Sequence, residues 1–287
     1  MSTALRQRFI DHMTVRRLSP KTRESYTNAV AGLAAYYRKS PEKLNDDQIQ
    51  AYLLYLIKQR RLAWSSCNVV FSGLRCFYGE VLKWEQTRFS IPPRPRKKQL
   101  PMLLSIEEVR RLFDATSNPK HRCLLMTIYG AGLRVSEAVH LKPCHIESSR
   151  MMIRVEQGKG MKDRYTLLPE RLLQELRSYY TTYRPDEYLF FGKSKSRPLP
   201  VGTAQKAYYH AKKRAGITGG RGIHTLRHCF ATHLMDMGVD IYAIKHMMGH
   251  SAIKTTSGYL HASRQKIANV ISPLDRAAGE SPCHAAF

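Results

Sequence analysis

The sequence of 287 residues is short of acidic side chains. It has 22 Asp and Glu against 47 Lys and Arg, so its formal net charge is +25. An excess this large predicts a broad positive potential whose favoured partner is a polyanion, nucleic acid first and an anionic membrane surface second. A basic amphipathic helix beside a lipid anchor would favour the membrane surface, and the sequence shows no such arrangement.

Long apolar runs are also missing. No stretch reaches the roughly 18 apolar residues that a membrane span requires, and the opening segment MSTALRQRFIDHM lacks the apolar core of a secretory signal. We therefore expect a cytoplasmic protein without a membrane partner. The six cysteines form no CxxC pair, which argues against a zinc knuckle and predicts free thiols in a reducing compartment.

Three helical patterns fill most of residues 1–90. Ser19 followed by Pro20 is typical of a helix start, and Asn45 with Gln48 three residues later resembles a capping box. A third stretch, from about 65 to 83, repeats apolar residues at helical spacing. The sequence therefore predicts a helical domain over residues 1–90. The stretch 91–103 follows it as a basic linker, because its four prolines prevent a continuous helix.

A second domain is predicted over residues 104–275. Ser105 with Glu108 forms another capping box, and helical patterns cover roughly 106–115, 120–129 and a stretch from near 134. The period then changes to that of two strands, around 152–155 and 165–168, joined by a glycine-containing hairpin. Helices return from Thr203, with Gly238 and Asp240 as a predicted end and start. Residues 276–287 carry no periodic pattern, which predicts a disordered tail.

These patterns predict a mainly α protein with a small antiparallel β-sheet. A helical N-terminal domain would be followed by a mixed α/β domain.

The C-terminal half contains the side chains that a phosphodiester exchange without a metal ion requires. Arginine can donate two hydrogen bonds to one phosphate, a nucleophile must attack in line, and a proton donor must reach the leaving oxygen. The candidates are Arg134, Glu137, Lys159, His224, Arg227, His250 and Tyr259. Residues three apart share a helix face, so His224 and Arg227 would lie together and Glu137 could brace Arg134.

Four motifs carry these residues in order along the chain. They are GLRVSE at 132–137, GKGMK at 158–162, HTLRHCFATHL at 224–234 and GHSAIKTTSGY at 249–259. In this order they resemble the tyrosine recombinase (phage integrase) family, most closely its compact Xer-type and transposon-borne members. The resemblance covers nearly the whole chain. It implies a helical domain that binds core DNA, joined by the linker to a catalytic domain.

The resemblance also implies a role for each basic candidate. Arg134 and Arg227 would clamp the scissile phosphate. His224 and His250 would hydrogen-bond to that phosphate and manage protons.

Two further roles concern the bonds that break and form. Lys159 would protonate the leaving 5′-oxygen, with Lys162 of the same hairpin as the alternative. Tyr259 would attack the phosphate to give a 3′-phosphotyrosyl link and a free 5′-hydroxyl. This link conserves the bond energy, so the resemblance implies no ATP, no metal ion and no other cofactor.

The implied partners are double-stranded DNA recombination sites and three further copies of the chain. Residues 264–274 would dock onto the neighbouring copy in a tetramer on two duplexes. A DNA-binding module without catalysis is disfavoured because all six catalytic positions are filled. A type IB topoisomerase is disfavoured by the Xer-like motifs, and a metal-dependent nuclease by the lack of clustered carboxylates. Chromosome dimer resolution and the integration or excision of a mobile element both remain open.

Overall fold

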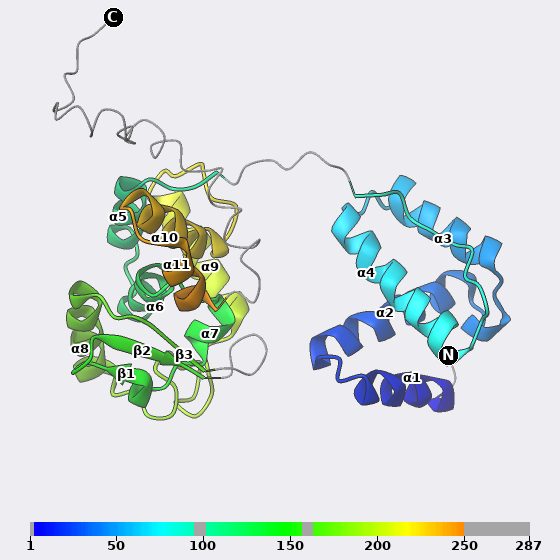
Figure 1. Ribbon diagram of the computed structural model, residues 1–287, viewed down its shortest axis with the longest axis horizontal. Helices are drawn as coiled ribbons and strands as arrows, with labels where there is room; N and C mark the ends of the chain where they lie inside the picture. The colour runs from blue at the N-terminus through cyan, green and yellow to red at the C-terminus, as the bar shows by residue number, and fades with distance from the viewer. Residues whose placement is uncertain (1–2, 95–101, 157–162, 250–287) are drawn as a thin grey trace, which may run out of the picture. The chain divides into compact units, whose positions relative to one another are not determined.

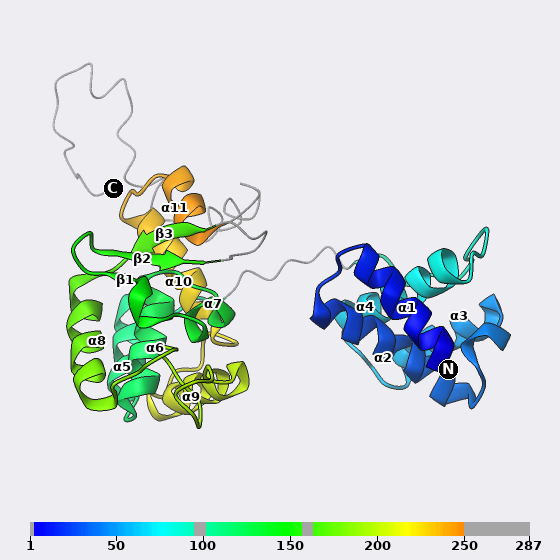
Figure 2. The same cartoon turned by 90° about the horizontal axis from the view of Figure 1, so that it is seen from below.

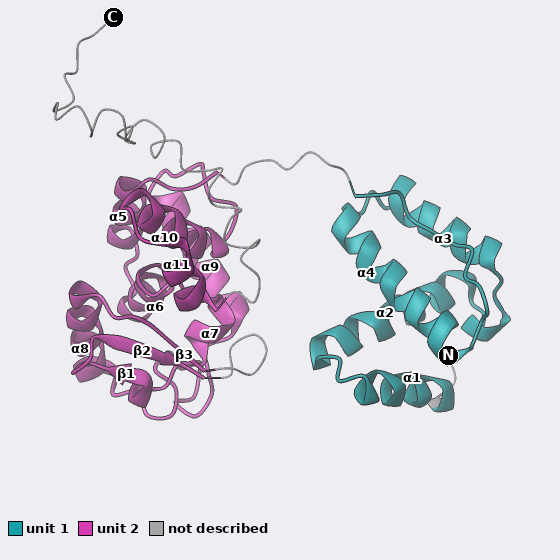
Figure 3. Ribbon diagram, in the orientation of Figure 1, with its two compact units in different colours: residues 1–98 teal, residues 99–287 magenta. Residues whose placement is uncertain are grey.

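The computed structural model describes residues 3–94, 102–156 and 163–249. The chain divides into two compact units, residues 1–98 and residues 99–287 (Figure 3). Within the described residues, no helix is both long enough and apolar enough to cross a membrane.

The first unit is built of helices (Figure 1). Its elements are α1 (Thr3–Val15), α2 (Pro20–Tyr37), η1 (Pro41–Lys43), α3 (Asp46–Lys58), α4 (Trp64–Arg75) and η2 (Cys76–Val81). Two predicted helix starts are confirmed. The Ser19 side chain accepts a hydrogen bond from the Thr22 amide at the start of α2, and Asn45 and Gln48 form a capping box at the start of α3.

The core of this unit forms where α2 packs against α4. Gly73 of α4 permits the close approach, because a Cβ there would lie 3.1 Å from the Cα of Tyr26 and 3.2 Å from the Cβ of Ala29. Apolar side chains from all four α-helices and from η2 complete the core; among them are Phe9, Met13, Val30, Leu33, Ile49, Leu53, Leu74 and Phe77.

The helix predicted from about 65 to 83 is not one continuous α-helix. It is α-helical only to Arg75 and continues as η2, a short π-helix over Cys76–Val81. One residue of this π-helix is bonded to a distant part of the core: the buried Tyr78 hydroxyl donates to the Pro41 carbonyl at 2.7 Å. The apolar spacing does not separate the two kinds of helix, since η2 also buries apolar side chains: Cys76, Phe77, Tyr78 and Val81.

The second unit combines helices with one small sheet (Figures 1 and 2). Its elements are α5 (Ile106–Asp114), α6 (Pro119–Gly130), α7 (Val135–Val139), η3 (Pro143–His145), β1 (Ile146–Glu147), β2 (Met152–Val155), β3 (Arg164–Leu167), α8 (Glu170–Tyr183), α9 (Val201–Arg214), α10 (His224–Asp236) and α11 (Ile241–Met248). The predicted fold class, mainly α with a small antiparallel sheet, is confirmed.

Helix α6 is the centre of this unit and lies between α8 and α10 (Figures 1 and 2). Six consecutive residues of α6, from Cys123 to Ile128, are buried, as expected for a helix covered on all sides. A buried helix of this kind gives α7 and α10, which pack against it, a rigid support.

The sheet has the order β1-β2-β3 with antiparallel pairing throughout. Ile153 of β2 pairs with Thr166 of β3, and Val155 pairs with Arg164. Side chains alternate across a strand, and in β3 the inward face carries Arg164 and Thr166 while Tyr165 and Leu167 are exposed. A charged side chain therefore points into the protein from β3.

Helix α8 was not predicted, because the sequence patterns indicate that helices return only from Thr203. Its buried face consists of Leu172, Leu173, Leu176 and Tyr179, spaced as in an amphipathic helix. Other helix boundaries agree with their predictions: Ser105 and Glu108 form the capping box of α5, and Asp240 caps α11.

Candidate active site

Arg134 is the N-cap residue of α7, directly before the first residue of that helix. Its backbone amide donates to Glu137 Oε2 at 2.8 Å, and its guanidinium Nη1 donates to Glu137 Oε1 at 2.7 Å. The predicted brace between these two side chains is therefore confirmed. Arg134 Nη2 also donates to the Gly249 carbonyl at 3.3 Å, so the guanidinium is held between α7 and the end of α11.

Arg227 reaches the same carboxylate from α10. Its Nη1 donates to the Gly132 carbonyl and its Nη2 to the Met248 carbonyl, each at 2.5 Å. The Nη1 atom lies 3.7 Å from Glu137 Oε2. The fold thus brings together two arginines that are 93 positions apart in the chain, as a clamp on one phosphate requires.

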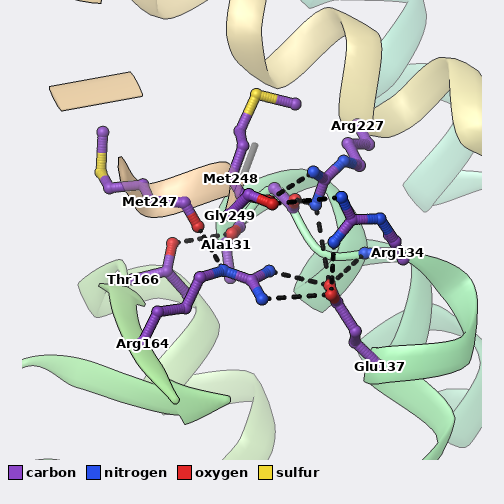
Figure 4. Close-up of polar contacts among 10 residues, drawn as sticks. Ala131, Arg134, Glu137, Arg164, Thr166, Arg227, Met247, Met248 and Gly249 are labelled. Atoms are coloured by element: carbon purple, nitrogen blue, oxygen red, sulfur yellow. Dashed lines mark hydrogen bonds and ion pairs between the residues drawn. The ribbon is translucent and has the colours of Figure 1, made fainter. Parts of the chain in front are cut away.

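A third arginine, Arg164 of β3, completes the cluster and was not among the predicted residues. It donates to both Glu137 oxygens, from Nη1 to Oε1 at 3.1 Å and from Nη2 to Oε2 at 2.8 Å. Its Nε donates to the Met247 carbonyl at 2.8 Å. Figure 4 shows the three guanidinium groups converging on Glu137 from α7, β3 and α10.

This cluster is buried and carries excess positive charge. The Glu137 side chain is 8% exposed, and those of Arg164 and Arg227 are 5% and 6% exposed. Burial raises the pKa of the Glu137 carboxyl, but the bonds and charge of Arg164 and the bonds from Arg134 outweigh it and leave that pKa below its ordinary value. Three arginines facing one ionised glutamate leave two positive charges in excess, which suits a phosphodiester.

His224 opens α10 and lies one helical turn before Arg227. Burial lowers the pKa of His224, and the charges of Arg227 and Arg134 lower it further. Both effects favour the neutral form of His224, and a neutral imidazole can donate one hydrogen bond and accept another. His228, on the next turn, also has a lowered pKa, through burial and the charges of His224 and Arg227.

His233 has a structural role further along α10. One of its ring nitrogens lies 2.9 Å from the Tyr129 hydroxyl and the other 3.1 Å from the Leu104 carbonyl. Cys229 of the same helix also bonds to the backbone of Leu104. Over residues 3–94, 102–156 and 163–249, the structure holds no group of three His, Cys, Asp or Glu side chains arranged as a metal site.

The remaining predicted site residues lie outside the described residues. They are Lys159, its alternative Lys162, His250 and Tyr259. The expected docking segment at 264–274, the tail at 276–287 and most of the predicted linker also lie outside them. Of the six predicted catalytic residues, the structure describes Arg134, His224 and Arg227 and brings them together.

Two protein families match the chain, and together the matches span most of its residues. Residues 102–266 match the phage integrase family, and residues 5–88 match the phage integrase N-terminal SAM-like domain. The chain therefore belongs to the phage integrase family, the tyrosine recombinases.

Individual relatives and structures agree with this assignment. The protein y4qK of Sinorhizobium fredii, whose name includes the terms integrase and recombinase, is 38% identical over 95% of this chain and 89% of its own length. The tyrosine recombinase XerA of Thermococcus kodakarensis is 34% identical over 88% of this chain and 89% of its own. The fold is similar to that of a lambda integrase tetramer bound to a Holliday junction, with a TM-score of 0.71, 18% identity, and coverage of 89% of this chain and 76% of the other.

Proposed function

We propose that this protein is a site-specific DNA recombinase that cleaves and rejoins strands through a covalent bond between Tyr259 and a DNA 3′-phosphate. The observation that carries the proposal is the convergence of Arg134 and Arg227 on Glu137, inside a cluster with two excess positive charges. Membership of the tyrosine recombinases supplies the type of reaction.

In the proposed reaction, Arg134 and Arg227 hydrogen-bond to the non-bridging oxygens of the scissile phosphate. These bonds stabilise the negative charge of the transition state, usually the largest catalytic contribution. His224, together with His250, adds hydrogen bonds to the same phosphate. The Tyr259 oxygen attacks phosphorus, and the bond from phosphorus to the 5′-oxygen breaks.

Proton transfer balances the step. His224 or His250 accepts the phenolic proton as the bond from Tyr259 to phosphorus forms, and Lys159 donates a proton to the departing 5′-oxygen; both proton transfers run in reverse in the second step. A 5′-hydroxyl of a second strand then attacks the phosphotyrosine, releases Tyr259 and restores a phosphodiester. Each step exchanges one phosphoester for another, so the reaction as proposed consumes no ATP.

The proposed substrate is a pair of double-stranded DNA sites held by four copies of the chain. The net charge of +25 supports a polyanionic partner, and the lambda integrase structure of similar fold is a tetramer on a Holliday junction. In this arrangement, residues 1–90 bind core DNA, 91–103 link the two domains, and 104–275 carry catalysis and docking. Its proposed location is the cytoplasm, where it would meet its DNA substrate.

The test is a trapping experiment on DNA containing a nick. Binding sites are first selected from random duplexes with the protein, and the selected duplex is then nicked beside the scissile bond so that the cleaved fragment diffuses away. We expect a covalent protein–DNA adduct that survives denaturation and forms equally well in EDTA. Tyr259→Phe should form no adduct, whereas Tyr242→Phe, which alters an exposed tyrosine of α11, should match the unmodified protein. An adduct with Tyr259→Phe, or its loss in EDTA, would contradict the proposal.

A further inference from the structure

The C-terminal end of α11 is held by the three clustered arginines at once. Three successive carbonyls each accept a hydrogen bond from a different arginine: Met247 from Arg164, Met248 from Arg227 and Gly249 from Arg134. The last carbonyls of a helix have no partner within the helix and carry its negative partial charge. The arginines therefore fix the end of α11 as well as binding Glu137.

Every nitrogen of the Arg164 guanidinium has a partner within the protein. All three of its nitrogens donate to protein oxygens, two of them to the Glu137 carboxylate and one to the Met247 carbonyl. Its side chain is 5% exposed, whereas that of Arg134 is 23% exposed. Because its two terminal nitrogens both bind the Glu137 carboxylate, the geometry of Arg164 suits a brace for that residue.

The brace acts on the carboxylate that all three arginines share. Glu137 Oε1 accepts from Arg134 and Arg164, and Oε2 accepts from the Arg134 amide and Arg164. A buried carboxylate needs compensating charge. Without Arg164, that compensation would fall on Arg134 and Arg227 alone, which would weaken their hold on a phosphate.

We propose that Arg164 is a positioning residue for strand cleavage, which neutralises Glu137 and fixes the end of α11 so that Arg134 and Arg227 keep their charge and direction for the scissile phosphate. The proposal rests on the proposed function, since it concerns the same site. It assigns Arg164 no contact with DNA.

Packing around Arg164 supports this role. Gly249 has a φ of +62°, and a Cβ added there would lie 2.9 Å from Arg164 Cδ and 3.0 Å from its Nε. The backbone at the end of α11 therefore lies directly against the guanidinium. A side chain enclosed in this way can transmit its position to the residues that it contacts.

The first test separates the rate of cleavage from the affinity for DNA. A displacement of about 1 Å in a catalytic group can cost about 100-fold in rate, so Arg164→Met should form the covalent adduct about 100-fold more slowly at saturating DNA. Its dissociation constant for the same DNA should stay within about threefold, because Arg164 does not touch the ligand. Arg122→Met is the matched control, since it removes another arginine–glutamate pair, Arg122 to Glu175, that joins α6 to α8 away from the cluster.

The second test is rescue by removal of the charge that Arg164 neutralises. Glu137→Gln in the Arg164→Met background removes the carboxylate that would otherwise draw on the charge of Arg134 and Arg227, so the double variant should cleave at least about 10-fold faster than Arg164→Met alone. Two substitutions that harmed only packing would add their effects or worsen them. A faster cleavage rate in the double variant therefore shows that Arg164 acts by neutralising Glu137, and not only by filling space.

Each outcome decides the proposal. If the unmodified protein forms no adduct, the proposed function itself fails. If it does form the adduct, the role of Arg164 is overturned by an Arg164→Met rate within threefold of normal, or by a double variant no faster than Arg164→Met. If Arg164→Met does not fold, Arg164→Lys replaces it, because lysine keeps the charge but cannot bond to both carboxylate oxygens. We then expect a loss of about 10-fold in rate at unchanged affinity, and a normal rate would overturn the proposal.

Discussion

Gly249→Ala tests whether the arginine cluster is as rigid as its contacts indicate. Gly249 ends α11 in the left-handed region, with a φ of +62°, which costs a residue with a Cβ about 1–2 kcal/mol. The new Cβ would also meet Arg164 at 2.9–3.1 Å, and forcing extra volume into a packed site costs about 1–3 kcal/mol. We therefore expect the variant to lower the free energy of unfolding by about 2–5 kcal/mol.

Gly216→Ala provides the matched control for backbone conformation. Gly216 has a φ of +65°, and a Cβ there would meet nothing within 4 Å, so only the backbone cost of about 1–2 kcal/mol applies. Urea unfolding of both variants, followed by circular dichroism, measures the difference, which isolates the contact with Arg164. Gly249→Ala should also slow adduct formation, whereas Gly216→Ala should leave it unchanged. Equal destabilisation by the two substitutions would refute the inference that Arg164 is fixed in place.

Three further predictions concern Glu137, Tyr78 and Lys159. The pKa of Glu137 is lower in the folded protein than ordinarily, so its carboxylate stabilises the fold above its ordinary pKa and this contribution is lost as the pH falls through the lowered pKa. Glu137→Gln should flatten the acid side of a plot of melting temperature against pH, and an unchanged plot would contradict this. Tyr78→Phe removes the hydroxyl that donates to Pro41 and should destabilise the first unit by about 1 kcal/mol, measurable by urea unfolding; a change near zero would count against that bond. Sulfur in place of the bridging 5′-oxygen leaves without protonation, because a thiol has a pKa of about 8.5. Such DNA should restore adduct formation to Lys159→Ala but not to Lys162→Ala, and the reverse result would assign the general acid to Lys162.

Local signals in the sequence predict the starts of several elements. The capping boxes of α3 and α5 are recognisable because each depends on two side chains three residues apart. The two longer strands are recognisable from the change in period, and they form β2 and β3. The π-helical turn of η2 is not predictable in this way, because it shares its apolar spacing with an α-helix and is accompanied by the distant bond from Tyr78 to Pro41.

The candidate site is predictable where motifs carry it and not where distant contacts build it. Arg134 and Glu137 are three residues apart, so their pairing follows from helix geometry. Arg164 makes its bonds to Glu137 and Met247, which are 27 and 83 positions away. The residue type alone does not mark one arginine of a basic chain as buried. The sequence feature that could indicate burial of Arg164 is the alternation of side chains along the strand, which places Arg164 on the same face as Thr166 and opposite Tyr165.

The most direct test of the proposed function is to identify the residue that becomes bonded to DNA. The covalent adduct from the nicked duplex would be digested with nuclease and protease, and the peptide carrying the remaining nucleotide would be sequenced by mass spectrometry. We expect the nucleotide on the Tyr259 oxygen, linked through its 3′-phosphate. A nucleotide on any other side chain, or a link through a 5′-phosphate, would contradict the proposed reaction.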